Sequence, residues 1–206
     1  MKDVATRLGR PRGRPRTFDR ARALDLAMRL FWRQGFETTS ISDLTAELGI
    51  NPPSLYAAFG DKEQLFREAA QRYQEEADRA AMAVYQAAPT ARAAVLKLLA
   101  AATLGLTRPG QPNGCMLVTA AGSCSAASPA LQAELGQLRA VSRRRMQARL
   151  KRAIGEGELP AGTDAAALAR FYTTIIQGMT TQRIDGATRK ELQATAEMAM
   201  RAWPIA

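Results

Sequence analysis

The stretch Ile41–Phe66, ISDLTAELGINPPSLYAAFGDKEQLF, contains the pattern that decides the fold of this chain. Ser40 precedes it as a helix cap, and Asp43 stands three positions later as the partner that a capping box requires. Gly49 follows the first apolar run, where the end of a helix favours a residue that tolerates left-handed backbone. We therefore predict a short helix that ends in a tight turn and has an apolar face made by Ile41, Leu44 and Leu48.

A second short helix is expected after the turn. Asn51 is a favourable cap, and Pro52 occupies the first helical position. Because Pro52 and Pro53 have no N–H, Ser54 carries the first backbone donor that the Asn51 side chain can accept. Two helices joined by a turn of about 3 residues with a glycine form the layout that places the second helix in the DNA major groove. The stretch therefore predicts a DNA-binding protein.

The charge of the chain agrees with this prediction. Its 206 residues include 29 Lys and Arg against 19 Asp and Glu, which gives a net charge of +10. Positions 1–22 hold eight basic and two acidic residues, so +6 of this charge lies ahead of the motif. A basic arm beside a helix-turn-helix is expected to bind phosphate, with an affinity that falls steeply with salt. The alternative is a solubilising tail that binds nothing.

The arm also contains a repeat, because GRPR occurs at positions 9–12 and again at 13–16. Proline fixes an extended backbone and glycine removes bulk, so such a segment fits the narrow minor groove with its arginines pointing inward. The stretch at 12–15 resembles the core of an AT-hook. We therefore take Arg12, Arg14 and Arg16 as candidate DNA contacts.

Several functional classes are excluded by composition. The basic start is not followed by an apolar stretch, so no signal peptide is expected, and the longest apolar segment, 93–106, is too short to span a bilayer. Two cysteines without any histidine predict neither a disulfide framework nor a zinc site, and no cofactor is expected. An enzyme is disfavoured because the chain lacks histidine, a nucleotide-binding glycine pattern and paired carboxylates. We expect a soluble cytoplasmic protein without membrane contact.

The whole chain is expected to be all-α. Capping residues and apolar periodicity predict helices, besides the two of the motif, at about 19–34, 61–87, 90–107, 128–155, 164–183 and 188–203. Gly35 is expected in the left-handed position after the first helix. A loop is expected at 108–114 and a short apolar segment at 115–121. The expected organisation is a basic flexible arm at 1–16, a three-helix DNA-binding domain at 17–77, and a helical domain at 78–206.

The region from Arg16 to Tyr73 is similar to the TetR/AcrR family of bacterial transcriptional regulators. The similarity rests on an ordered set: Phe31, Gly35, Phe36, Thr39, Ser40, Leu44, Gly49, Ile50, Leu55, Tyr56, Phe59, Lys62, Leu65 and Phe66. Two positions depart from the usual pattern. Thr45 replaces a small alanine, and Ala57 stands where many members carry a polar residue or histidine, which leaves fewer side chains to read bases.

Residue roles on DNA follow from helical geometry and from this resemblance. Geometry directs Pro53, Ser54 and Ala57 toward base edges. The resemblance implies phosphate contacts for Tyr56, Lys62, and either Thr39 or Ser40. The alternative for Tyr56 is a packing residue, and Ser40 is in any case a helix cap.

The resemblance implies that the C-terminal domain binds an effector and forms a homodimer. Wide apolar faces in the last two helices support this, and we take as candidate interface residues Phe171, Ile175, Met179, Leu192 and Ala199. The alternative is that these faces form only intramolecular core. A two-fold dimer would bind a near-palindromic double-stranded DNA operator.

The effector is a small molecule whose identity the sequence leaves open. Gln177 is a candidate pocket residue among apolar neighbours. The segments around Cys115 and Cys124 resemble a C-terminal domain type in which some relatives with Gly-Cys sense electrophiles or oxidants. The alternative for each cysteine is a small buried apolar residue. The arginine-rich run at 139–152 is expected to be mainly a solvated face, with an acidic ligand or a second DNA contact as alternatives.

Together these features predict a sequence-specific regulator, most simply a repressor that a small molecule or thiol modification releases from its operator. The alternative is an architectural nucleic-acid-binding protein with little sequence preference. The ratio of specific to non-specific affinity distinguishes the two.

Overall fold

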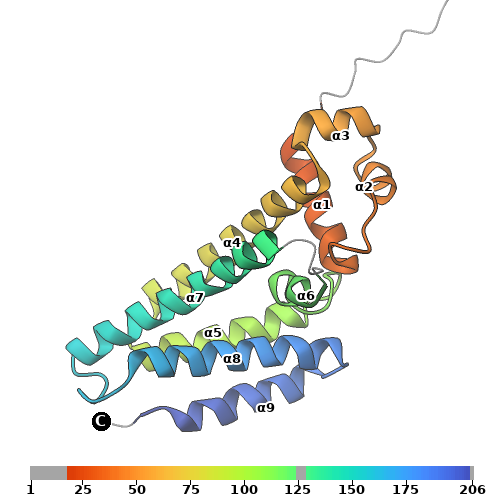
Figure 1. Ribbon diagram of the computed structural model, residues 1–206. Coiled ribbons are helices and arrows are strands. Elements are labelled where there is room, and N and C mark those ends of the chain that lie inside the picture. Colours follow the sequence, from red (N-terminus) through yellow and green to blue (C-terminus); the bar gives the residue numbers. More distant parts are fainter. Residues whose placement is uncertain (1–17, 124–128, 205–206) are drawn as a thin grey trace, which may run out of the picture.

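The computed structural model describes residues 18–123 and 129–204, with the side chains of 120–123 left aside. Within these ranges the chain forms nine α-helices and one 3₁₀ turn, and no strand occurs, which confirms the all-α prediction (Figure 1). The elements are α1 (Arg20–Gln34), α2 (Ile41–Leu48), α3 (Pro52–Phe59), α4 (Lys62–Ala87), α5 (Ala91–Leu106), α6 (Met116–Ser123), α7 (Pro129–Gly155), α8 (Ala165–Ile184), α9 (Arg189–Ala199) and η1 (Met200–Ala202). None of the described helices is long and apolar enough to cross a membrane.

The helix ends of the motif form as their capping residues predict. Ser40 and Asp43 make a reciprocal capping box, and Gly49 ends α2 in left-handed backbone at φ 67° and ψ 33°. The Asn51 side chain accepts from the Ser54 N–H at 2.9 Å, which fixes the start of α3. Gly35 also has positive φ, but its ψ of 169° is extended. The left-handed turn expected there is therefore wrong, and the chain instead leaves α1 extended, so that Phe36 enters the core.

The N-terminal core lies between α1, α2, α3 and the first half of α4. Leu44, Leu55 and Leu65 are fully buried, and Phe31 meets Phe66 edge to face at 4.9 Å. Burial of each such side chain stabilises the fold by about 1.5–3 kcal/mol, so this small core holds the three short helices in one orientation. The inward face predicted for α2 is confirmed, and α3 turns Leu55 and Phe59 inward.

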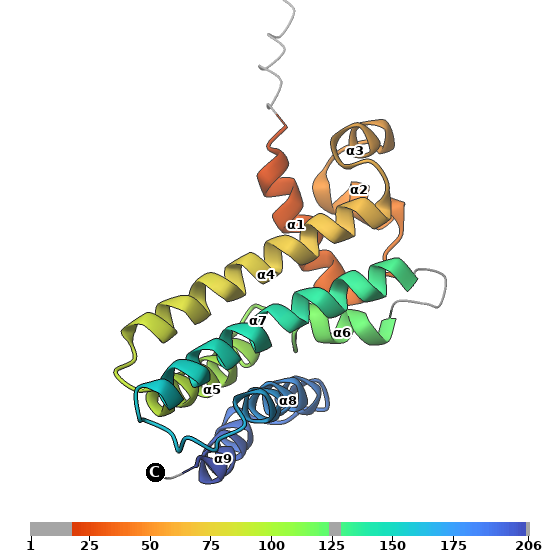
Figure 2. The same cartoon turned by 60° about the vertical axis from the view of Figure 1, so that its left-hand side comes forward.

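This core extends beyond the N-terminal region. Met116 and Leu117 of α6, with Leu131 and Leu135 of α7, are buried in the same cluster. Helix α4 also runs without a break through the boundary expected at 77/78, and α7 lies beside it (Figure 2). The DNA-binding part and the C-terminal part therefore share both a helix and a core.

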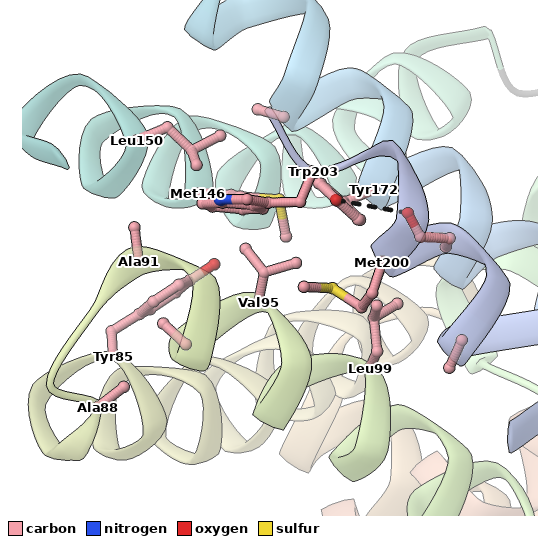
Figure 3. Packing of buried hydrophobic residues seen from close by; sticks show 14 of the residues in the cluster. Tyr85, Ala88, Ala91, Val95, Leu99, Met146, Leu150, Tyr172, Met200 and Trp203 are labelled. Atoms are coloured by element: carbon pink, nitrogen blue, oxygen red, sulfur yellow. Dashed lines mark hydrogen bonds between the residues drawn. The ribbon is translucent and has the colours of Figure 1, made fainter. Parts of the chain in front are cut away.

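A second core lies at the other end, between α5, α7, α8, α9 and the last turn of α4. Tyr172 and Trp203 pack at 6.1 Å between ring centres, and the Tyr172 hydroxyl lies 3.5 Å from the Ala199 carbonyl (Figure 3). Three of the residues expected at a dimer interface, Met179, Leu192 and Ala199, are buried in this core. For these three the interface prediction is wrong, because their helices turn that face toward the chain's own interior.

Candidate nucleic-acid interface

Helix α3 presents the face that the sequence predicts. Pro53, Ser54 and Ala57 are exposed, whereas Leu55 and Phe59 are buried beneath them. Tyr56 is 49% exposed, so about half of its surface is accessible to a DNA phosphate. The helix lies at the end of the molecule opposite α8 and α9 (Figure 1). Its outer face is therefore open to a partner as large as a DNA duplex.

Of the two hydroxyl residues predicted to contact phosphate before α2, Ser40 is exposed and Thr39 is buried. The Ser40 hydroxyl and the Ser40 N–H both donate to Asp43 Oδ2, at 2.7 and 2.9 Å, and these hydrogen bonds lower the pKa of the Asp43 carboxyl. The Ser40 hydroxyl also accepts from the Asp43 N–H. Thr39 is fully buried, and its hydroxyl donates to the Gly35 carbonyl at 2.6 Å. The Thr39 side chain is therefore unable to reach a phosphate, and only Ser40 of this pair remains a candidate.

Lys62 stands at the start of α4, beside the α1–α2 turn. Its Nζ lies 4.5 Å from the centre of the Phe36 ring and 3.4 Å from the Glu37 carbonyl oxygen. Within the described residues no carboxylate pairs with it. Because the N-terminus of a helix also favours anions, this ammonium group is well placed for a phosphate next to α3.

A residue that the sequence did not single out holds α3 in place. Arg20 donates to both carboxylate oxygens of Glu68, at 2.7 and 2.9 Å, and its Nε donates to the Ala58 carbonyl at 3.1 Å. The same guanidinium lies 4.6 Å from the centre of the Phe59 ring. Arg20 thus ties the end of α3 to α1 and α4. The three partners are 38 to 48 residues away in sequence, so no local pattern indicates them.

The remaining predicted DNA contacts, Arg12, Arg14 and Arg16, lie outside the described residues, as does Cys124.

Comparison with known proteins identifies this arrangement. The profile of the bacterial regulatory proteins, tetR family, matches residues 23–69, and that of the tetracyclin repressor-like C-terminal domain matches residues 91–199. This chain belongs to the tetR family. It is therefore a DNA-binding transcriptional regulator and not an enzyme.

Individual relatives in the family cover almost the whole chain. The HTH-type transcriptional repressor ComR of Escherichia coli (strain K12) is 35% identical over 194 residues, 94% of this chain and 92% of ComR. A solved structure of a cysteine mutant of the TetR family transcriptional regulator CifR, complexed with 26-bp double-strand operator DNA, is 43% identical. It superposes with a TM-score of 0.88, covering 93% of this chain and 100% of CifR. The reduced form of E. coli NemR, at 16% identity and a TM-score of 0.80, shares the fold.

This tetR-family regulator also has a cavity behind its DNA-binding helices. The cavity measures about 490 Å³ and lies between α1, α4, α5, α6, α7 and α8. Cys115 and Gln177, both predicted as possible effector residues, line it. So do Trp32 of α1 and Tyr73 of α4, whose rings meet edge to face at 5.0 Å. The same cavity therefore contacts α1, a helix of the DNA-binding part, and α8, a helix of the C-terminal part.

Cys115 lies at the start of α6 and is half-buried and unpaired. Its carbonyl accepts from the N–H groups of Val118 and Thr119, so the residue begins the helix. Burial, reinforced by the neighbouring Cys115, raises the pKa of Tyr73. Cys115 therefore interacts with Tyr73, whose ring packs against the indole of Trp32.

The exposed faces of α8 and α9 carry apolar and small side chains. Met198 is 59% exposed, and Ile184 and Phe171 are also exposed, although large apolar groups usually avoid water. On α8, Phe171 shares one face with Thr174, Gly178 and Thr181. This face lies opposite the side that carries Met179. Of the predicted interface residues, Phe171 is exposed and Ile175 is half-buried, so both remain available to a second subunit.

Proposed function

We propose that this chain is a repressor that binds a near-palindromic operator as a homodimer and leaves it when the cavity is occupied or Cys115 is modified. The observation that carries the proposal is α3. Its outer face exposes Pro53, Ser54 and Ala57, and its inner face is locked into the core by Leu55 and Phe59. The operator complex of CifR and the repressor ComR support the same role for this chain.

On DNA, we assign three kinds of contact. Ser54 reads a base edge, while Pro53 and Ala57 pack against thymine methyl groups. Tyr56, Ser40 and Lys62 bind phosphates and set the register of α3 in the groove. Arg12, Arg14 and Arg16 of the arm at 1–16 add minor-groove contacts whose strength depends on salt. Because DNA is the partner, the site of action is the cytoplasm.

The dimer brings two copies of α3 to the same side of the operator. We assign its interface to the exposed faces of α8 and α9, including Phe171 and Ile175. Small residues such as Gly178 allow the backbones of two helices to approach closely. In this scheme residues 17–77 bind DNA and residues 78–206 hold the effector cavity and the interface.

Release follows from the position of the cavity. An occupant touches Trp32 on α1 and Gln177 on α8, two helices that belong to the DNA end and to the dimer end. The dimer can adopt conformations that differ in the distance between its two α3 helices. A ligand that binds one of these conformations more tightly shifts the population toward it. An adduct on Cys115 would act at the same place, because the thiol lines the same cavity.

Selection of sheared genomic DNA by the purified protein tests the proposal, at physiological salt and with excess competitor DNA. Enrichment of a few near-palindromic sites is the expected result. Recovery of DNA without any shared site would contradict it, and would favour an architectural binder that recognises DNA through charge alone.

A further inference from the structure

The walls of the cavity are mostly apolar. All six helices that enclose it contribute apolar or aromatic side chains, among them Met28, Val84, Leu98, Leu106, Met146 and Ile176. A volume of about 490 Å³ is in the range of sites that enclose a drug-sized molecule. The lining therefore selects a ligand with an apolar body.

The charged groups around the cavity are unbalanced. Four arginines and two carboxylates line it. Both carboxylates already have partners, because Glu76 pairs with Arg72 at 3.4 Å and Asp78 pairs with Arg145 at 2.9 Å. Asp78 also accepts from the amide of Gln74 at 2.9 Å. Among the lining residues, the acidic groups are thus satisfied, and Arg145 is the one arginine with an acidic partner.

Arg139 is the most informative of the other three arginines. It is half-buried on α7, and its Nη1 donates to the Leu117 carbonyl at 2.9 Å. In the described part of the chain no carboxylate lies within 4.0 Å of its guanidinium. Arg29 and Arg108, which are exposed, likewise have no acidic partner there. A guanidinium that has lost part of its water gains most from an anion that accepts two hydrogen bonds at once.

Trp32 adds a buried hydrogen-bond donor to the lining. Its Nε1 is the only buried side-chain nitrogen or oxygen of the described lining that has no hydrogen-bond partner. An indole N–H donates and never accepts. A buried donor without a partner destabilises its surroundings, so a ligand that brings an acceptor offsets this cost.

We propose that the effector cavity takes a small organic anion with an apolar body, of the aryl or alkyl carboxylate class. The carboxylate binds Arg139, and the apolar body lies against α4, α5 and α8. This inference rests on the proposed function, since it names the chemical class of the ligand at that effector site.

Matched probe compounds test the class by calorimetry on the full chain. Three apolar bodies are each used as carboxylate and as amide: 4-phenylbutyrate, 2-naphthoate and octanoate with their neutral amides. Each pair has the same apolar body and differs in charge. For at least one body, the carboxylate is expected to bind about tenfold more tightly, the magnitude of a charge-assisted hydrogen bond.

Variants test whether Arg139 is the residue that causes the preference for carboxylates over amides. Arg139→Gln should reduce it to about threefold or less, and Arg139→Lys should restore part of it because the charge returns. Arg144→Gln is the matched control, since Arg144 lies exposed on the same helix and does not line the cavity. That variant should bind like the wild type. Thermal unfolding of all three variants shows whether each one is folded.

The outcomes are unambiguous. Equal affinity for carboxylates and amides, no binding of any compound, or an unchanged preference in Arg139→Gln overturns the anion proposal. Operator binding by the same preparations is measured in parallel. If that binding is specific while the carboxylate preference is missing, only this inference fails; loss of specific DNA binding in the wild type would instead contradict the proposed function.

Discussion

The guanidinium of Arg20 lies 4.6 Å from the centre of the Phe59 ring, and its Nη2 donates to both carboxylate oxygens of Glu68. Phe59 is the last residue of α3, so the contact joins the C-terminal end of the DNA-facing helix to α1 and α4. The nearby hydrogen bond from Arg20 to the Ala58 carbonyl serves the same connection. Arg20 therefore fixes the tilt of α3 without belonging to its exposed face.

Arg20→Ala should weaken operator binding through this positioning role. We expect a loss of about 1 kcal/mol in the free energy of unfolding, because the pair is half exposed and partly screened. Operator affinity should fall by about tenfold. Urea unfolding and fluorescence anisotropy measure the two quantities. Arg20→Lys keeps the charge but has no second nitrogen that could bind the Ala58 carbonyl while the first binds Glu68, so it should lose most of the affinity as well. Full affinity in that variant would mean that only charge matters.

Ser54→Ala should change which base is preferred at one position of each half-site. The Ser54 hydroxyl is exposed on α3, while its backbone N–H, which binds Asn51, is unaffected by the substitution. A lost base contact is worth about 1–3 kcal/mol of discrimination. Selection from a randomised operator library measures it. Tyr56→Phe is the control: it removes one phosphate donor and should weaken all sites alike. An unchanged base preference in Ser54→Ala would mean that Ser54 does not face a base.

Replacing Arg14 and Arg16 by Ala should weaken binding to all DNA and reduce its dependence on salt. The slope of log affinity against log salt concentration is negative, and each phosphate contact removed reduces its magnitude by about 1. Titrations at several salt concentrations measure the slope. Arg143 and Arg144, replaced together, remove the same charge from α7 and should leave the slope unchanged. An unaltered slope in the arm variant would place the arm outside the interface.

The local features of this fold were predictable because capping and periodicity act over a few residues. Ser40 and Asn51 cap their helices as predicted, and the face of α2 that carries Leu44 is turned inward as predicted. Cys115 and Gln177 do line one cavity, although their roles stay predictions.

Long-range packing was not predictable in the same way. Some apolar helix faces are wide enough to form both a core and a subunit interface, and the sequence does not reveal which half of such a face is turned inward. Met179 and Leu192 were therefore assigned to the interface, although both are buried in the core. Thr39 is buried although its neighbour Ser40 is exposed, because its hydroxyl closes the turn after α1. Leu131 and Leu135 complete a core whose other members, apart from Met116 and Leu117 of α6, lie more than 60 residues earlier in the sequence.

Cys115→Ser should abolish release of the operator by thiol reagents such as N-ethylmaleimide. Serine has nearly the same size, so the contact with Tyr73 and the start of α6 are kept. Anisotropy of labelled operator DNA, before and after treatment, measures the response. Cys124→Ser is the matched control and should respond like the wild type. Persistent release in Cys115→Ser, with release lost in Cys124→Ser, would assign the reactive thiol to Cys124 instead.

Glu158 should make the C-terminal core sensitive to acid. Burial raises the pKa of this carboxyl, but the Ala91 N–H and the Arg149 guanidinium outweigh that effect, so its pKa lies below the usual value. A carboxyl with a lowered pKa in the folded state stabilises the protein at neutral pH, and this stabilisation is lost as the pH falls from about 5 through the folded-state pKa. Glu158→Gln should therefore unfold with a pH profile that is flatter in this window. It should also lose about 3 kcal/mol at pH 7, because Arg149 is buried and would keep only one carboxylate partner, Glu156, at 4.0 Å. Urea unfolding between pH 3 and 7 measures both effects, with Glu197→Gln as an exposed control on α9. Parallel pH profiles for the wild type and Glu158→Gln would show that the ion pair does not contribute to the acid sensitivity.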